Sequence, residues 1–300
     1  FPPAVIERCS HLLAEHPLRR QLLCMASSNS VVNALGPTFV SQVVAERGCD
    51  AADVVRAYRI ARAVTGAAAR WDAVEKLEGV EPEIQAELMA GIDAVVDSAT
   101  RWYLSWEPEG DLATVIAAGR NGIERLTEAL PGLGTEERRA RRQADVDRLV
   151  GAGVPAEIAT AHALSGELEH SPDMVAVAAA TGRELDDVAK VFFAIGGELR
   201  LDWLETQLTE LRAGSRMQRW ALLAVREDAT QARRALAQAA LDEAGGRSPA
   251  EAVEGFLHTR DAATRRFAAF LRALSREGEP DLAGLTLAVR HLRALADSSS

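Results

Sequence analysis

Apolar side chains along this chain recur at alternating steps of four and three residues, the spacing that places them on one face of an α-helix. The clearest series is Leu88, Ile92, Val95, Ala99, Trp102 and Trp106, which we expect to form one buried stripe. A strand would alternate apolar and polar residues with a period of two, and no convincing stretch does so. The sequence therefore predicts an all-α fold, a multi-helix orthogonal or bundle array of about a dozen helices.

Residues that commonly cap helices mark where these helices begin. Several prolines stand directly before an apolar-periodic run, where a first-turn proline is tolerated. Thr135, Ser171 and Ser248 are predicted N-caps, because their hydroxyl can accept a hydrogen bond from the first turn. Asp50 is a fourth predicted N-cap, and with Asp53 it has the spacing of a capping box.

One segment of the chain is echoed later in it. From Gly48 the sequence reads GCDAADVVRAYRIA, and from Gly182 it reads GRELDDVAKVFFAI. A helix led by Trp71 follows the first copy and one led by Trp203 follows the second. We interpret the copies as two similar helix-turn-helix units, each burying an aromatic residue and a tryptophan, with chance likeness between amphipathic helices as the alternative. Aligning the glycines pairs Asp53 with Asp187, Val54 with Val188, Tyr58 with Phe192 and Ala61 with Ile195.

A chain of 300 residues can bury one large core or two moderate ones. Its composition, 48% hydrophobic and 26% charged, is that of a globular protein. The weakest-packed places are residues 107–110 and 131–134, and either could separate an N-terminal from a C-terminal half. Both are too short to be free linkers, so we expect sub-domains in contact.

The charge and the cysteines limit the partners and the compartment. A net charge of −10 argues against nucleic acid as the main partner, since phosphate binding needs a basic face. No apolar run approaches the roughly 20 residues that cross a bilayer, so we expect no membrane partner. Cys9 and Cys24 sit in apolar stretches and Cys49 completes an odd set without CxxC spacing, as in buried thiols of a reducing compartment. We expect a cytoplasmic location by default.

No stretch of the sequence assembles a complete catalytic or cofactor site. Residues 151–157 approach a dinucleotide fingerprint, but they follow an Arg-rich helical run and a glutamate replaces the third glycine, so we predict a helix-to-helix turn. No Walker-type loop, HExxH motif or Cys/His cluster occurs, so we predict no metal site. We also assign no catalytic role to the histidines that lack a Ser or Cys nucleophile nearby in sequence, His162, His170, His258 and His291.

Two further clusters have ordinary explanations that we favour. The Arg-rich run at residues 136–142 begins with acids and continues with arginines, as a solvated helix face does. The run Arg101-Trp102-Tyr103 with Trp106 could form an aromatic platform, but we favour a core stripe ending at a helix terminus.

Residues 27–38 resist such an explanation. Small polar residues, among them Ser28, Asn29 and Asn33, interrupt an apolar helix, and Thr38 follows a Gly-Pro turn. Asn and Ser are disfavoured inside helices because their side chains compete for backbone hydrogen bonds. The segment therefore indicates a polar cavity, an interdomain contact or part of a ligand pocket.

Several motifs, in their order and spacing, resemble the region that follows the catalytic core of the large NAD-dependent glutamate dehydrogenases. The likeness begins at residues 16–20 and 29–39, and continues through residues 57–62 and 99–102. It is strongest in Thr181-Gly182-Arg183 with residues 187–196 and 201–204, and it ends with residues 280–282 and 292–295. The resemblance covers nearly the whole chain.

The resemblance implies that this chain is the C-terminal helical domain of such an enzyme. The parent enzyme would oxidise L-glutamate to 2-oxoglutarate and ammonium with NAD, but its catalytic residues lie upstream. It implies no catalytic residue, no cofactor and no metal in this chain, and a homo-oligomeric parent. It further implies that Ser28, Asn29, Asn33 and Thr38 lie near the substrate cleft, since a helix in this position of smaller glutamate dehydrogenases lines the glutamate pocket.

The resemblance also sets the expected domain limits. Residues 1–47 would pack on the upstream catalytic core, residues 48–130 would form a sub-domain with a long Trp-rich helix, and residues 131–300 a C-terminal sub-domain. An independent helical scaffold that binds a protein partner is the alternative function. The Phe-Pro-Pro start without Met favours the dehydrogenase domain, because a separate module would show its own start.

Overall fold

The computed structural model describes residue 12 and residues 15–106, 111–276 and 278–297. In chain order the helices of this part are α2 (Arg19–Leu35), α3 (Phe39–Arg47), α4 (Ala51–Val64), α5 (Ala67–Glu75), α6 (Pro82–Ser105), α7 (Leu112–Ala129), η1 (Leu130–Gly132), α8 (Glu136–Gly151), α9 (Ala156–Ala163), α10 (Ser165–Leu168), α11 (Ser171–Thr181), α12 (Leu185–Glu198), α13 (Leu201–Glu210), α14 (Arg216–Ala244), α15 (Pro249–Thr259), α16 (Asp261–Arg276) and α17 (Leu282–Asp297).

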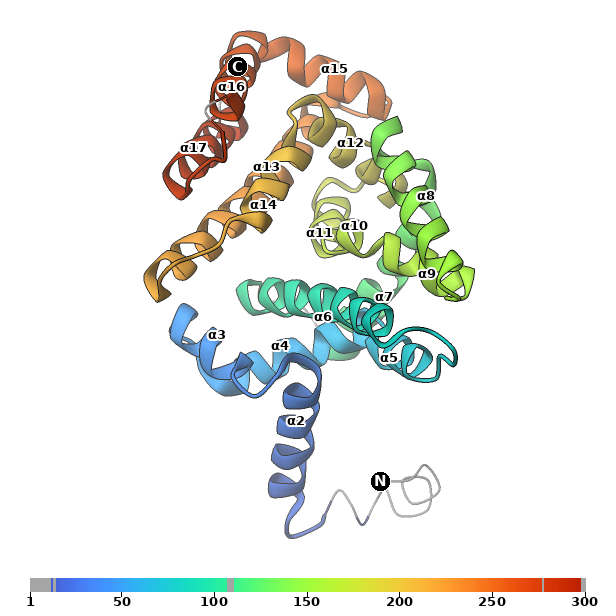
Figure 1. The fold of residues 1–300 in the computed structure, drawn as a ribbon. Coiled ribbons are helices and arrows are strands. Elements are labelled where there is room, and N and C mark those ends of the chain that lie inside the picture. Colours follow the sequence, from blue (N-terminus) through green and yellow to red (C-terminus); the bar gives the residue numbers. More distant parts are fainter. Residues whose placement is uncertain (1–11, 13–14, 107–110, 277, 298–300) are drawn as a thin grey trace.

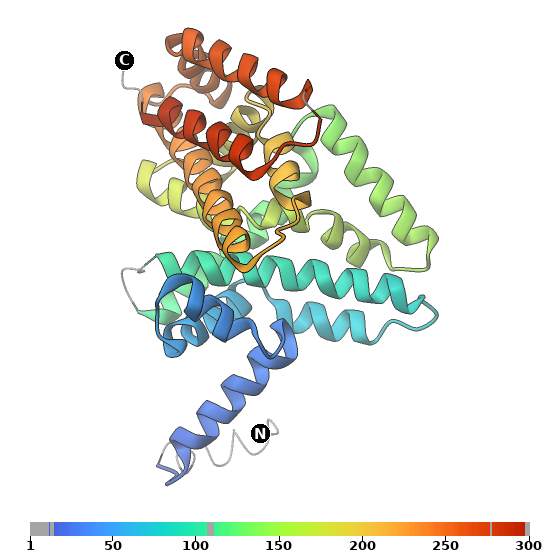
Figure 2. The same cartoon turned by 60° about the vertical axis from the view of Figure 1, so that its left-hand side comes forward.

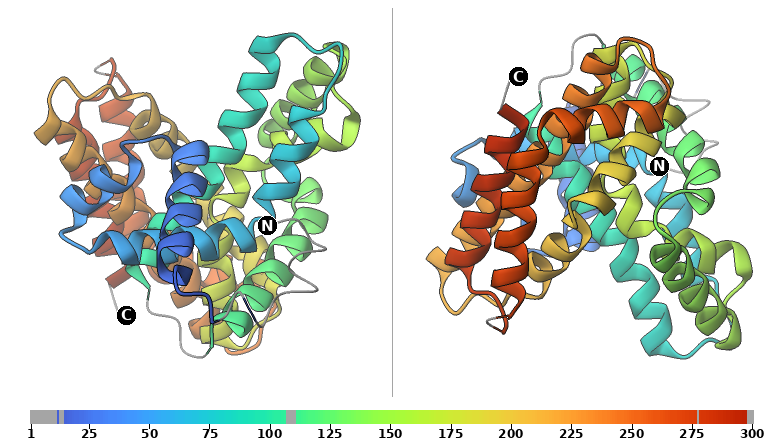
Figure 3. Two further views of the ribbon diagram at one scale, coloured as in Figure 1. Left: turned by 90° about the horizontal axis from the view of Figure 1, so that it is seen from below. Right: turned by 90° about the horizontal axis from the view of Figure 1, so that it is seen from above.

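The predicted all-α fold is confirmed, since the described residues form sixteen α-helices, a short 3-10 helix and no strand. The number of helices exceeds the predicted dozen partly because turns at Leu164 and His170 divide one apolar stretch into α9, α10 and α11. Helix α2 projects from the layer of α3, α4 and α6, away from α15–α17 (Figures 1 and 2). Viewed along the vertical axis, α16–α17 and the α8–α9 pair lie on opposite sides of the molecule (Figure 3).

The two echoed segments adopt matching local structures. Gly48 and Gly182 both have left-handed backbones, with φ of 66° and 65°, which glycine adopts without strain. Each precedes a helix of 14 residues, α4 or α12, and the two helices bury four aligned positions in common, Ala57 with Val191 among them. A short helix carrying a partly exposed tryptophan follows, α5 or α13, and then a long helix, α6 or α14. The buried pairs are Val54 with Val188, Tyr58 with Phe192 and Ala61 with Ile195.

Buried apolar side chains form three clusters. The largest contains residues of α7 and of the helices from α10 to α17, and it centres on α12, which buries Phe192 and Ile195 completely. The second joins α2 to α6, and Leu149 and Ala159 extend it into α8 and α9. The third packs α7 on α4 and α6. The division at residues 1–47, 48–130 and 131–300 stays a prediction, and its candidate boundary at 107–110 lies outside the described residues.

The helix starts were predicted partly correctly. Thr135 and Ser248 are N-caps whose hydroxyls accept hydrogen bonds from the first turn, and Ser248 forms a complete capping box with Glu251. The Asp50 capping box is wrong, because Asp50 occupies the N-cap position but its side chain makes no cap hydrogen bond. Ser171 is also wrong as an N-cap, since the preceding turn already bends at His170 and places Ser171 inside α11.

Two expectations about burial need correction. Trp102 and Trp106 do not continue the buried stripe of α6, since Trp102 is only half-buried at the cavity and Trp106 lies beyond the helix end with 38% of its surface exposed. Tyr103 completes the stripe instead. Cys24 is exposed on α2, contrary to the expected buried thiol, because α2 packs on its neighbours through one narrow face. Cys9 lies outside the described residues. No helix of the described part is both long and apolar enough to cross a membrane.

Helix α7 packs closely on its neighbours through two glycines. A Cβ built on Gly122 would lie 2.3 Å from Cγ2 of Val175 on α11. We expect Gly122→Ala to lower the free energy of unfolding by about 1–3 kcal/mol, the usual cost of overpacking, although Ala is the better helix former. Urea unfolding followed by circular dichroism measures the change.

Gly151→Ala is the matched control for that substitution. No atom lies within 4 Å of a Cβ built on Gly151, so we expect its stability to be unchanged or slightly raised. Equal stability of the Gly122→Ala and Gly151→Ala chains would contradict the close packing of α7 on α11.

Candidate functional site

The four residues singled out in the sequence are exposed. Ser28, Asn29 and Asn33 lie on α2, and Thr38 lies directly before α3, where its Oγ1 accepts a hydrogen bond from Nε2 of Gln42 at 3.2 Å. None of them lines the large cavity at the centre of the molecule. Their place at the substrate cleft of a complete enzyme stays a prediction.

The inner face of α2 holds the helix to the layer beneath it. Val31 is buried, and Ser30 lies beside Tyr58 of α4. The Tyr58 hydroxyl donates to the carbonyl oxygen of Ser30 at 2.9 Å, and its oxygen lies 3.0 Å from the Ser30 hydroxyl. This contact fixes the orientation of α2, so its opposite face points away from the molecule.

The outer face of α2 is a stripe of exposed apolar residues with polar residues between them. Leu18, Met25 and Val32 recur every seven residues, and each is more than 40% exposed. Asn29 lies on the same stripe between Met25 and Val32, because residues three and four apart share a helix face. Ser28 and Asn29 thus lie among exposed apolar residues that no other described residue covers.

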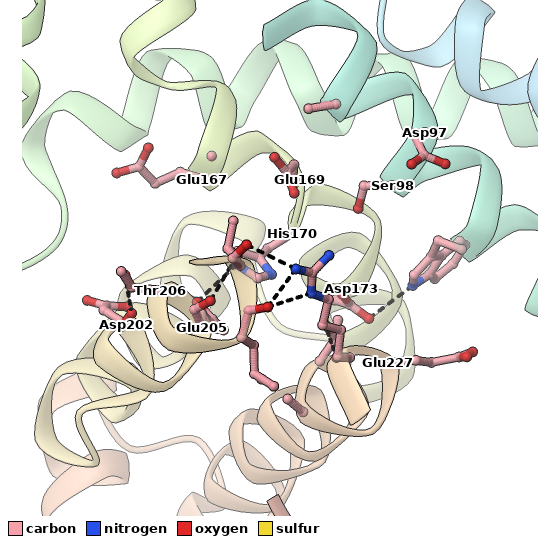
Figure 4. Close-up of a pocket in the computed structure, with 18 of the residues that line it drawn as sticks. Asp97, Ser98, Glu167, Glu169, His170, Asp173, Asp202, Glu205, Thr206 and Glu227 are labelled. Atoms are coloured by element: carbon pink, nitrogen blue, oxygen red, sulfur yellow. Dashed lines mark hydrogen bonds and ion pairs between the residues drawn. The ribbon is translucent and has the colours of Figure 1, made fainter. Parts of the chain in front are cut away.

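A cavity of about 1550 Å³ lies between α6, α8, α11, α13 and α14. Figure 4 shows charged side chains from several of these helices around it. Four of the five tryptophans of the chain line it, namely Trp102, Trp106, Trp203 and Trp220. This cavity was not predicted, although the grouped aromatic residues at 101–106 were a signal for it.

The interpretation of the Arg-rich run as a solvated face is correct for five of its seven residues, which are exposed, and wrong for Arg138 and Arg142. Arg138 and Arg142 lie four residues apart on the inner side of α8 and face Glu167, with nitrogen-to-oxygen distances of 3.6 and 3.3 Å. Arg142 also donates to backbone carbonyl oxygens, including that of Leu133 at 2.6 Å. The i,i+4 spacing that suits a surface helix suits an internal ion-pair network equally well.

Asp173 of α11 is the most buried carboxylate at the cavity, with 1% of its surface exposed. Its Oδ1 accepts hydrogen bonds from Nε1 of Trp102 at 2.9 Å and from Arg234 at 3.2 Å. Its Oδ2 is buried and has no hydrogen-bond partner among the described residues. Burial raises the pKa of Asp173 against the opposing effects of Trp102 and Arg234, because the ionised form loses more hydration than its neighbours restore.

Glu205 of α13 forms a two-oxygen ion pair with a buried arginine beside the cavity. Nη1 of Arg233, a completely buried residue, lies 2.8 and 2.9 Å from its two oxygens. Nε2 of His170 lies 3.6 Å from it. Burial alone would raise the pKa of Glu205, but Arg233 and His170 outweigh burial and hold it well below its usual range.

Two more carboxylates face the same part of the cavity. Asp97 of α6 accepts a hydrogen bond from Arg101 at 2.8 Å, yet burial keeps its pKa raised. Burial also raises the pKa of Glu169, which follows α10 and interacts electrostatically with His170, Asp97 and Glu205. In the part of the chain that the structure describes, the Glu169 carboxylate has no hydrogen bond or ion pair within contact distance.

The remaining sequence-based sites have a plain structural outcome. Residues 151–157 form the turn between α8 and α9, as predicted. Within the described ranges, no three His, Cys, Asp or Glu side chains are placed to hold a metal ion together. Nε2 of His162 lies 3.5 Å from Glu87. His170 lies at the cavity and faces Glu205, a contact that sequence spacing did not reveal.

The chain is similar in sequence to known proteins over its whole length. A family model described as "Glutamate dehydrogenase, C-terminal" matches residues 1–294. Proteins named NAD-specific glutamate dehydrogenase from Halomonas elongata and Pseudomonas aeruginosa are 29% and 32% identical over 306 residues, which cover 100% of this chain and 19% of each relative. One from Mycobacterium tuberculosis is 26% identical and is covered to 18%. The chain thus spans about a fifth of the length of these curated relatives.

The raised pKa of Asp173 gives a testable pH dependence. The folded chain binds this proton more tightly than the unfolded chain, so ionised Asp173 costs stability near pH 7 and the cost fades as pH falls towards 4. Asn keeps an oxygen for Trp102 and Arg234 but carries no charge. We therefore expect Asp173→Asn to raise Tm at pH 7 by about 2 °C, and the gap to wild type to close on acidification.

Asp242→Asn is the control, because Asp242 is exposed on α14 and has no contact partner among the described residues. We expect its Tm to follow that of wild type at every pH. Calorimetric scans between pH 4 and 8 measure all three proteins, and a lower Tm for Asp173→Asn at pH 7 would contradict the assigned cost of the buried charge.

Proposed function

The chain belongs to the family of glutamate dehydrogenase C-terminal regions, and on that premise we propose that it is the non-catalytic helical domain of an NAD-dependent glutamate dehydrogenase. The complete enzyme would convert L-glutamate, NAD and water to 2-oxoglutarate, ammonium and NADH. The supporting observation is that the whole chain aligns with about a fifth of relatives that carry this name. The catalytic residues and the NAD site are then assigned to the rest of the enzyme, and this domain to packing, assembly or regulation.

The upstream catalytic part of the same polypeptide is the proposed partner of α2. The outer stripe of α2 buries its apolar side chains only if another surface covers it, and leaving such a stripe in water is unfavourable. Ser28 and Asn29 within the stripe fit a contact with a defined register, as polar residues in helical interfaces do. The same contact would bring Ser28, Asn33 and Thr38 close to the substrate cleft.

A combined Leu18→Asp, Met25→Asp and Val32→Asp substitution in the complete enzyme tests this docking. Each carboxylate would be buried without a partner at the interface, so we expect the domain contact to weaken by several kcal/mol. Limited proteolysis should then release the C-terminal region at least about tenfold faster than from the wild type. The mass of the assembled enzyme in solution should stay that of the wild-type oligomer.

Leu287→Asp is the matched control, because Leu287 is 46% exposed on α17, far along the chain from α2. We expect its proteolysis rate to equal that of wild type. A triple variant that keeps the wild-type rate would contradict the docking of α2 on the upstream part, and one that only dissociates the oligomer would assign α2 to a subunit contact instead.

The place of the polar residues at the cleft has its own test. We expect Asn29→Ala with Asn33→Ala in the complete enzyme to raise KM for glutamate about threefold to tenfold, as loss of one or two polar contacts would. Ser275→Ala is a control for an exposed polar residue on α16. Steady-state kinetics measures both, and an unchanged KM and kcat in the double variant would exclude these residues from the cleft.

A further inference from the structure

Two hydrogen bonds hold α2 to the helices beneath it, and both involve the hydroxyl of Tyr58. This hydroxyl donates to the carbonyl oxygen of Ser30 at 2.9 Å. Its only hydrogen is used in that bond, so the Ser30 hydroxyl is the donor in the second contact, at 3.0 Å. In the part of the chain that the structure describes, no other hydrogen bond joins α2 to another helix.

The apolar contacts of α2 do not fix its orientation by themselves. The structure describes every residue of this helix, and Val31 is the only buried one, while Ala34 and Leu35 are half-buried against the same cluster. Apolar contacts have no preferred direction, whereas a hydrogen bond needs its donor and acceptor at a defined distance and angle. A rotation or slide of α2 in place would leave the buried Tyr58 hydroxyl without partners, which is unfavourable. The Tyr58 contact therefore selects one orientation of α2.

The second of the two similar units indicates that the packing of a unit does not need this hydroxyl. Phe192 occupies in α12 the position that Tyr58 occupies in α4, and their exposed fractions are 0% and 1%. A ring without a hydroxyl thus fills this position in a helix of the same length. The hydroxyl of Tyr58 finds its partner on α2, which lies outside both units. The additional oxygen of Tyr58 therefore serves α2 and not the core of its own unit.

Ser30 stands beside two of the polar residues that the sequence singled out. Asn29 directly precedes it, and Asn33 follows it by three residues, within one helical turn. Both asparagines are exposed, and neither side chain makes a hydrogen bond with a described residue. Because one turn of a helix moves as a stiff body, anchoring Ser30 also fixes where Asn29 and Asn33 point.

We propose that Tyr58 is a positioning residue of the complete enzyme, whose hydroxyl holds α2 so that Asn29 and Asn33 face the substrate cleft. Tyr58 would not touch the substrate, since it is buried beneath α2. This role rests on the proposed place of the two asparagines at the cleft, and it adds the group that keeps them there. A helix that is oriented before glutamate binds need not be ordered on binding, so the contact should raise the affinity for glutamate.

Steady-state kinetics of the complete enzyme with Tyr58→Phe tests this role. We expect KM for glutamate to rise about threefold, as the loss of one hydrogen bond would cause, and kcat to stay within about twofold of wild type. Ser30→Ala should raise KM less, by about twofold, because the carbonyl oxygen of residue 30 still accepts from Tyr58. Thermal scans establish that each variant folds. Should Tyr58→Phe fail to fold, Ser30→Ala decides in the same way.

Tyr103→Phe is the matched control, because Tyr58 and Tyr103 are the two tyrosines of the chain. Tyr103 is also buried, and its hydroxyl makes no hydrogen bond with a described residue. Its ring packs with residues of α4 and α7 and not with α2. We expect its KM to equal that of wild type. An equal rise in both variants would show that any lost hydroxyl in this layer loosens the enzyme, and would overturn the proposal.

A combined variant decides whether Tyr58 acts through the asparagines. With Asn29→Ala and Asn33→Ala already present, Tyr58→Phe should raise KM no further, because the groups that it positions are gone. A further rise of about threefold would mean that the two effects are independent, and the positioning role would then be wrong.

Two outcomes separate this role from the proposed function. If Asn29→Ala with Asn33→Ala leaves KM unchanged, the place at the cleft is wrong, and the role of Tyr58 falls with it. If that double variant raises KM while folded Tyr58→Phe does not, the asparagines lie at the cleft and Tyr58 does not position them.

Discussion

The buried guanidinium of Arg233 joins the hydrophobic core to the charged cavity. The guanidinium carbon, Cζ, lies 4.4 Å from the centre of the Phe192 ring, and Nη1 pairs with Glu205. A Cβ on Gly196 would lie 2.4 Å from its Nη2, so the glycine of α12 is what makes room for it. Because a charge in the interior is tolerated only when paired, Arg233 fixes α12, α13 and α14 relative to one another. His170 and Arg233 both act electrostatically on Glu205 and on Asp173, so the place of Arg233 also influences these two groups of the cavity.

Most of the helical array could be predicted because its signals are local. The period of the apolar residues identified α6, and the two echoed segments correspond to α4 and α12, which bury several aligned positions in common. Thr135 and Ser248 behave as expected because capping needs only residues within one turn. Ser171 fails because the helix start there depends on how α10 runs into α11, a tertiary feature that no window of the sequence contains.

The charged cavity could not be predicted for a related reason. Trp102, Asp173, Glu205 and Arg233 lie far apart in sequence, and only the packing of four helices brings them together. A charged stripe on a helix also looks the same whether it faces water or an internal cavity. Arg138 and Arg142 show this, since their spacing fitted a solvated face and their side chains instead form ion pairs inside the molecule.

The two similar units explain why the cavity exists at all. Each unit ends in a long helix, α6 or α14, and residues of both helices line the cavity. Within a unit, the long helix packs on the preceding α4 or α12 through apolar residues, so its other side is left for polar groups. The polar sides of α6 and α14 therefore both contribute charged residues to the cavity. Helix α2 lies outside both units, and no described residue covers its exposed apolar side chains. The domain therefore has two unlike surfaces, a cavity lined by paired charges of both signs and an exposed apolar stripe on α2.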